Sequence, residues 1–253
     1  MSLLSPPDSN VKLSKSQGLG YLPYGLSLAP ADLSGRNVCA WSTVGCVNPC
    51  VGGERSGRAK FLPEIMVARI RKTRWYFDDR AGFMEQLAKE IEAAHRKAQR
   101  QSLNLALRLN VFSDLEWRLI KHPAGWTIFD AIDELPGTRV YDYTKSIRRA
   151  TRELTTDYKT RWHNVFSKSE VNHAECLEFL RQGGSVAIPF AARMHALPRW
   201  HDGYRVVDGD LHDLLFLQPK NRVVGLAAKG ALKKDNPEGF AVMPRDNVTL
   251  GGW

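Results

Sequence analysis

The chain has 253 residues, of which 43% are hydrophobic and 25% are charged. This balance is that of a globular protein and excludes wholesale disorder and collagen-like or coiled-coil architecture. No apolar run approaches the roughly 20 residues that a membrane-spanning helix needs. The polar beginning of the chain also lacks the apolar stretch of a secretory signal. We therefore expect a soluble protein of the cytoplasm.

The formal net charge is +9, and the basic residues are concentrated in three segments. Residues 55–74 and 145–168 each hold seven lysines or arginines against one and two acids, and residues 220–234 hold five against none. Such clusters are typical of proteins that bind a polyanion, so we expect nucleic acid or a phosphorylated substrate as a partner and no membrane. The alternative is that they are ordinary solvated helix faces.

The first half of the chain predicts a short lead-in, a strand and two helices. Residues 1–20 show no periodicity and predict a flexible lead-in before an α/β domain over 21–253. A strand is predicted over 24–29 and a Gly/Cys/Asn/Pro-rich loop over 34–57. Pro63 suits the first turn of a helix with an apolar face. Asp78 and Asp79 predict the cap of a second helix that runs to Arg100.

The clearest strand signal is the segment 103–111, LNLALRLNV, in which every odd position is Leu or Val. This alternation predicts a strand with one face buried against apolar partners. In a barrel the other face would turn into the lumen, and Arg108 and Asn110 would lie at the carboxyl-terminal mouth.

The second half alternates predicted strands and helices. The strands cover 139–144, 159–167, 185–190, 204–208 and 222–227, and the helices cover 127–135 and 172–182. Such alternation favours parallel βαβ units. The expected fold is therefore one α/β domain that forms a full or partial parallel (βα) barrel, with a cysteine-rich loop after the first strand. A doubly wound open sheet is the alternative.

Three of the four cysteines, Cys39, Cys46 and Cys50, lie within twelve positions of the predicted loop. Thiolates at this spacing can converge on one metal centre. Three of them suit a [4Fe-4S] cluster with an open position, or a zinc ion with a fourth ligand from elsewhere. The alternative is that they are unmetallated thiols in a loop. Cys176 falls in the apolar pattern of a predicted helix and is expected to be a buried core thiol.

Polar residues follow most of the predicted strands, and in parallel α/β folds the site lies at this edge. We expect Asp114, Lys145, Asp208 and Lys229 to be catalytic. Asp208, Asp210 and Asp213 could also chelate Mg²⁺, although carboxylates so spaced are more often turn formers. The expected substrate-binding residues are Arg108, Asn110, Ser113, Tyr143, Ser167, Lys168 and Asp210. Phosphate-binding glycine loops, serine-hydrolase elbows and zinc-protease motifs are absent from the sequence.

Ordered blocks of sequence resemble an uncharacterised family carried by bacteriophages and plasmids, related to the phage "gene product eighty-eight" proteins. The blocks are Asn37-x-Cys39, Gly45-Cys46, Cys50, Ala68-Arg69-Ile70-x-x-Thr73, Leu107-Arg-Leu-Asn110, Ser113-Asp114, Tyr141-Asp-Tyr-Thr-Lys145, Phe166-Ser167-x-Ser169-Glu170, Asp208-Gly-Asp210, Asp213 and Val224-Gly-Leu-x-Ala-Lys229-Gly230. The resemblance covers about residues 26–242.

More distantly, the family is similar to radical-SAM-like barrels, in which three cysteines after the first strand hold a four-iron cluster. Those barrels have the spacing C-x3-C-x2-C, whereas this chain has C-x6-C-x3-C. The resemblance therefore implies cluster ligation by the three cysteines, and implies S-adenosylmethionine more weakly.

These features predict a phage- or plasmid-encoded metal protein, expected to be an enzyme acting on nucleic acid or a nucleotide in the host cytoplasm. The first alternative is a non-catalytic nucleic-acid-binding protein with a structural zinc. The second is an interaction protein that acts on host machinery.

Overall fold

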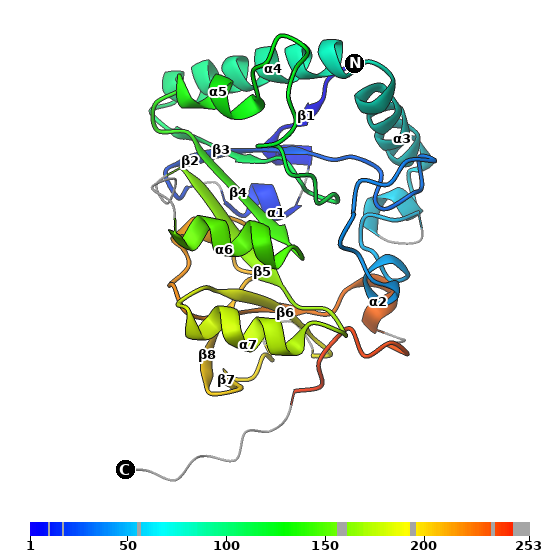
Figure 1. Cartoon of the computed structure of the whole chain (residues 1–253), viewed down its shortest axis with the longest axis vertical. Coiled ribbons are helices and arrows are strands. Elements are labelled where there is room, and N and C mark those ends of the chain that lie inside the picture. Colours follow the sequence, from blue (N-terminus) through cyan, green and yellow to red (C-terminus); the bar gives the residue numbers. More distant parts are fainter. Residues whose placement is uncertain are drawn as a thin grey trace.

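The computed structural model describes residues 1–9, 11–16, 18–54, 57–155, 161–192, 196–233 and 236–244. Within them a nine-stranded sheet has the order β1-β2-β3-β4-β5-β6-β9-β8-β7 (Figure 1). All neighbouring pairs from β2 to β8 are parallel, and β1 and β7 are antiparallel to their neighbours. The strands are β1 (Leu4–Ser5), β2 (Tyr21–Leu26), β3 (Asn104–Arg108), β4 (Arg139–Thr144), β5 (Trp162–Ser167), β6 (Val186–Phe190), β7 (Trp200–His201), β8 (Tyr204–Asp208) and β9 (Val223–Ala227).

A closed barrel, the fuller form of the expected fold, is not what this sheet forms. Its two edges end in the two-residue strands β1 and β7, which pair only with their inner neighbours among the described residues. The parallel α/β class is confirmed, and the sheet is open.

Helices connect the parallel strands and cover one face of the sheet (Figure 1). None of the described helices is long and apolar enough to cross a bilayer. The helices are α1 (Val11–Ser14), α2 (Val44–Val47), α3 (Pro63–Asp78), α4 (Arg80–Arg100), α5 (Ile128–Asp133), α6 (Ile147–Thr155) and α7 (His173–Arg181), and the 3-10 turns are η1 (Pro7–Ser9), η2 (Gly57–Lys60), η4 (Leu215–Leu217) and η5 (Gly230–Lys233).

The alternation in β3 buries one face of the strand in an apolar core, as the sequence predicts. Leu105, Leu107 and Leu109 pack in a core with Phe83 and Ile91 of α4, and all five are fully buried. The carboxylate of Asp79 caps α4 by accepting the backbone N–H of Gly82 at 2.9 Å.

The opposite face of the sheet is also covered. Ala106 of β3 and Tyr141 of β4 pack with Leu214 and Leu215, and Phe216 lies against the same cluster. This face would line the lumen of a barrel. Here the segment around η4 fills it with apolar side chains.

Some predicted elements lie elsewhere. The first long strand is 21–26 rather than 24–29, and Leu28 and Ala29 are buried beyond its end. The basic stretch after β4, for which no helix is predicted, forms α6. Within the expected flexible lead-in, β1 pairs with β2 and Leu3 and Leu13 are buried. The predicted strand 159–167 begins in residues outside the described part.

Candidate functional site

The three clustered cysteines lie in the connection between β2 and α3, which folds over the ends of β3 and β4 (Figure 1). The backbone N–H of Asp114, beyond β3, donates to the carbonyl of Val38 at 2.8 Å. Arg69 of α3 donates to the carbonyl of Gly52 at 2.7 Å, and its guanidinium lies 4.3 Å from the centre of the Phe112 ring. The cysteine segment is therefore tied to the carboxyl edge of the sheet.

The thiol of Cys39 both accepts and donates a hydrogen bond. Its Sγ accepts the backbone N–H of Ala31 at 3.3 Å and donates to the carbonyl of Phe112 at 3.3 Å. Burial, with smaller contributions from the nearby Cys50 and Cys46, raises the pKa of Cys39 to about 11 against the opposing hydrogen bond from Ala31. This thiol is protonated at neutral pH in the metal-free protein.

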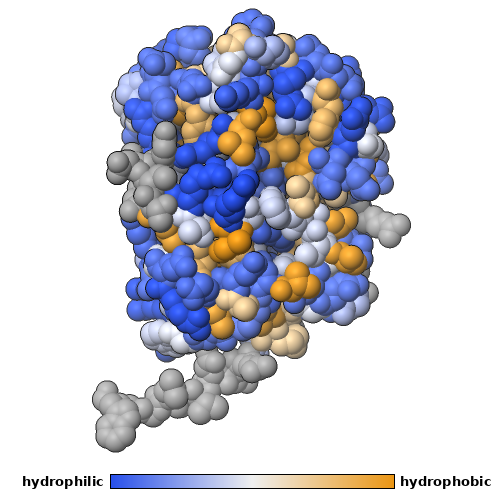
Figure 2. All heavy atoms as spheres, viewed as in Figure 1, coloured by the Kyte–Doolittle hydropathy of each residue, from blue (hydrophilic) through white to orange (hydrophobic). Residues whose placement is uncertain are grey.

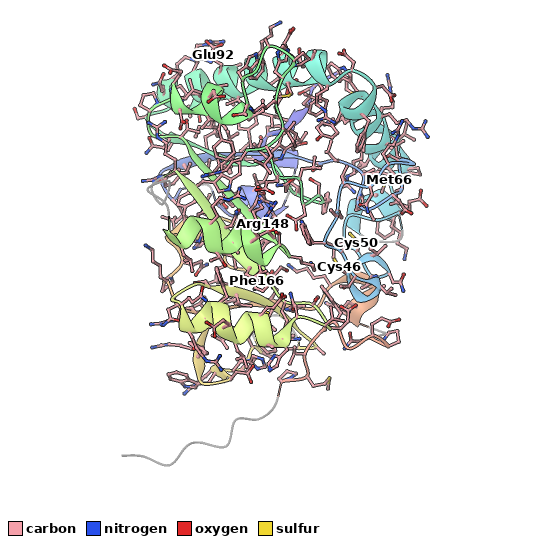
Figure 3. All side chains as sticks on the ribbon, viewed as in Figure 1. Cys46, Cys50, Met66, Glu92, Arg148 and Phe166 are labelled. Atoms are coloured by element: carbon pink, nitrogen blue, oxygen red, sulfur yellow. The ribbon has the colours of Figure 1, made fainter. Side chains whose placement is uncertain are left out.

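Cys46 lies within α2, and Cys50 follows the helix close to it (Figure 3). Burial raises the pKa of Cys50, and Cys46 adds to that rise. The backbone N–H groups of Gly52 and Gly53 and the ammonium of Lys145 oppose it. Each of the three thiols thus lies within electrostatic range of the other two.

The donor set has the chemistry of a metal–thiolate centre, because peptide N–H groups directed at sulfur stabilise the thiolate form. Among the described residues, however, no three His, Cys, Asp or Glu side chains are placed closely enough to hold a metal ion. Ligation would therefore require the three side chains to turn toward one another.

Glu170, beyond β5, anchors the short helix α2. Its carboxylate accepts the backbone N–H of Gly45 at 2.9 Å and the hydroxyl of Thr43 at 2.8 Å. Burial acts to raise the pKa of Glu170, but hydrogen bonds from its own backbone, Thr43 and Gly45 outweigh it and hold the pKa below its ordinary value. Glu170 belongs to the resembling blocks of sequence, yet the sequence assigns it no role.

Lys145 follows β4 and lies at the same edge. Its Nζ is 3.5 Å from the hydroxyl of Ser167 and 5.4 Å from the centre of the Phe240 ring. Among the described residues, no carboxylate lies within ion-pair distance of Lys145. The structure therefore brings Lys145 close to Ser167 and within electrostatic range of Cys50, and their shared role in a site stays a prediction.

Asp114 and Asn110 are occupied by structural contacts. Asp114 accepts the backbone N–H of Lys145 at 2.8 Å and pairs with Arg149. The amide of Asn110 donates to Asp142 at 3.0 Å, and its carbonyl oxygen accepts the hydroxyl of Ser113 at 2.9 Å. These side chains fix the loop after β3, which supports the cysteine segment.

Arg108 and Asp213 form an ion pair, with Nη1 and Oδ2 2.9 Å apart and both side chains nearly buried. The ring of Tyr143 lies 4.9 Å from the guanidinium of Arg108, and the hydroxyl of Tyr141 donates to Asp213 at 3.4 Å. Arg108 and Tyr143 thus lie in the filled interior beneath the η4 segment.

The remaining predicted residues have local partners. Asp208 accepts the backbone N–H of Asp210 at 2.8 Å, which is a turn-forming contact. Asp210 pairs with Lys229 and accepts the backbone N–H of Ala227 at 2.9 Å. Lys168 is buried and donates to the carbonyl of Ser169 at 3.1 Å. The structure does not bring Asp208, Asp210 or Lys229 into contact with the thiols.

Many residues of the basic segments make internal bonds. Lys72 and Arg74 of α3 donate to backbone carbonyls at 2.8 and 3.3 Å. In α6, Arg148 and Arg152 both pair with Glu116. The face that carries α6 is covered by mixed hydrophilic and hydrophobic residues (Figure 2). Part of the positive charge of these segments is therefore used within the fold.

Together, the fold and this edge define an α/β protein with an open, mostly parallel sheet and a group of three thiols beside a lysine at the carboxyl ends of its strands. The family model described as Gene product 88 matches residues 3–243, so the chain belongs to that family. This confirms the expected relation to the phage gene-product proteins. Neither the curated proteins nor the solved structures include a match to the chain, and the similarity to radical-SAM-like barrels is accordingly unsupported by them.

Proposed function

We propose that this protein is a metal-dependent enzyme whose centre is held by Cys39, Cys46 and Cys50 at the carboxyl edge of the sheet. The observation that carries the proposal is that the segment bearing the three thiols is tied to this edge beside Lys145. Asp114 binds the backbone of both Val38 and Lys145, and Arg69 binds Gly52. The uninterrupted order β2-β3-β4-β5-β6 supports it, because sites in parallel α/β proteins form at this edge.

An iron–sulfur cluster is the metal group that we favour. Three cysteines leave one iron open to a substrate, and such a cluster supplies one-electron chemistry. The N–H groups of Gly52 and Gly53 would balance the charge on Cys50, and burial of Cys39 would limit solvent access. Zinc, held by the same thiols and a fourth ligand, is the alternative.

The substrate class that we propose is a phosphate-bearing one, such as a nucleic acid or a nucleotide. Lys145 adjoins Ser167, and no carboxylate of the described residues lies within ion-pair distance of it. An ammonium and a hydroxyl together can bind a phosphate oxygen. Arg108 and Lys229 contribute less directly, because each already pairs with an aspartate.

The test is metal analysis of protein purified without oxygen. We expect brown protein, absorbance near about 400 nm and about four irons per chain, as a [4Fe-4S] cluster requires. Cys39→Ala should lose the metal, whereas Cys176→Ala, which changes a buried thiol of α7, should retain it.

Colourless protein with about one zinc per chain would instead support the non-catalytic nucleic-acid-binding protein with a structural zinc. Protein without any metal, or full metal content in Cys39→Ala, would overturn the proposed centre.

A further inference from the structure

The three thiols are anchored to three different parts of the molecule. Cys39 is fixed by its own hydrogen bonds to Ala31 and Phe112. Cys50 precedes Gly52, whose carbonyl is held by Arg69. The segment that carries Cys46 has a third anchor, which is Glu170.

Glu170 binds α2 with both carboxylate oxygens. Oε1 accepts from Gly45, the residue next to Cys46, and Oε2 accepts from Thr43, which precedes the helix. A helix of four residues has little stability of its own, because nucleation of a helix costs conformational entropy and so short a helix forms few hydrogen bonds to offset it. The carboxylate therefore supplies a large part of what fixes the backbone at Cys46.

The contact is also tight. A Cβ atom at position 45 would lie 2.8 Å from Oε2 of Glu170, so only glycine allows the carboxylate to approach the backbone this closely. Gly45 is buried, while Val44 and Val47 of the same helix are exposed. Glu170 therefore binds the buried side of α2.

We propose that Glu170 is the positioning residue of the thiol centre, which holds Cys46 in register with Cys39 and Cys50. The effect of Glu170 on metal binding rests on the proposed function, whereas its effect on the position of Cys46 does not. Side chains that orient metal ligands typically change metal affinity by about 10- to 100-fold when they are removed.

The first experiment measures each thiol separately in the metal-free, reduced full chain. A short pulse of iodoacetamide, followed by peptide mass spectrometry, gives an alkylation rate for every cysteine. In Glu170→Ala we expect Cys46 to react at least about threefold faster than in the wild type, because its local backbone opens more often. Cys39 and Cys176 should keep their rates, and Gly45→Ala should reproduce the effect.

The second experiment titrates Co²⁺ into the same proteins and follows the thiolate-to-metal absorbance. Glu170→Ala should bind Co²⁺ about 10- to 100-fold more weakly, and Glu170→Gln, which keeps one acceptor oxygen, should lie between it and the wild type. Glu175→Ala, an exposed glutamate in α7, is the matched control and should bind like the wild type.

The outcomes separate the two proposals. If the wild type does not bind Co²⁺ while Cys46 alone accelerates in Glu170→Ala, the metal function fails and the positioning role stands. If Cys46 keeps its wild-type rate, or if all four cysteines accelerate equally, Glu170 does not position Cys46 and the inference is overturned.

Discussion

The guanidinium of Arg149 donates a buried hydrogen bond of 3.2 Å to the carboxylate of Asp142, and it also forms an ion pair with Asp114. Asp142 is fully buried in β4, and burial raises its pKa to about 6 although Arg149 and Arg108 oppose the rise. One arginine of α6 thus joins the end of β4 to the loop after β3, on which the cysteine segment rests.

The neighbouring arginines of α6 predict very different mutational effects. Arg149→Met should lower the free energy of unfolding by about 3–5 kcal/mol, because it leaves two buried carboxylates without their cation. Arg148→Met should change it by no more than about 0.5 kcal/mol, since the Arg148 side chain is 68% exposed. Urea unfolding of both variants checks this, and equal losses would contradict the assigned roles.

A second prediction concerns stability at acid pH. Burial, reinforced by Lys220, lowers the pKa of His163 to about 4 from 6.5. Between these values the unfolded chain binds a proton that the folded chain does not, so stability is full above pH 6.5 and falls as the pH drops toward 4. In His163→Gln, the decrease in the free energy of unfolding over this pH range should be smaller than in the wild type by up to about 3 kcal/mol.

Urea unfolding at pH 7.5 and 4.5 measures the difference. A His163→Gln variant that still loses as much stability as the wild type would disprove the assignment.

Gly52 predicts a steric effect at the thiol site. A Cβ atom there would lie 2.5 Å from the ring of Phe112, which Arg69 covers on its face. Gly52→Ala should therefore destabilise the fold by about 1–3 kcal/mol and disturb the N–H that points at Cys50. Thermal unfolding measures the loss, and Gly52→Ala should cost less in a Phe112→Ala background, where the ring atoms nearest to the new Cβ are absent. An equal cost in both backgrounds would show that the ring is not the obstacle.

A fourth prediction concerns nucleic acid. Because Lys72, Arg74, Arg149 and Lys168 are used internally, we expect them to make no phosphate contacts. Lys72→Gln should therefore leave the slope of log affinity against log salt unchanged. Fluorescence anisotropy with a labelled oligonucleotide at increasing salt gives the slope. A slope that is shallower by about 0.9 in Lys72→Gln would mean that this lysine leaves its partner and contacts a phosphate on binding.

The sequence predicts the elements whose pattern is local. The alternation of Leu105, Leu107 and Leu109 and the cap at Asp79 are both found as expected. The sequence does not predict α6, because the apolar side of this helix is short and its arginines are typical of a solvated surface. In the structure, however, Arg149 of α6 is buried. Whether an arginine is buried or exposed depends on the residue that it pairs with in the folded chain. That residue is distant in sequence, so the local pattern does not reveal it.

The candidate site shows the same division. The spacing of the cysteines indicates that they belong together, and the structure brings them within electrostatic range. Glu170 lies 125 positions after Gly45, and Asp213 lies 105 positions after Arg108. Only the strand order places such residues side by side, so spacing rules could not select them.

The apolar plug of Leu214, Leu215 and Phe216 has a consequence for access. Among the described residues these side chains cover the middle of that face, so a substrate of the proposed site would reach Lys145 from the rim where the parallel strands end. Such an approach would suit the nucleic-acid form of the proposed substrate, because a polymer can extend along a rim and present one unit at a time to the sulfur atoms.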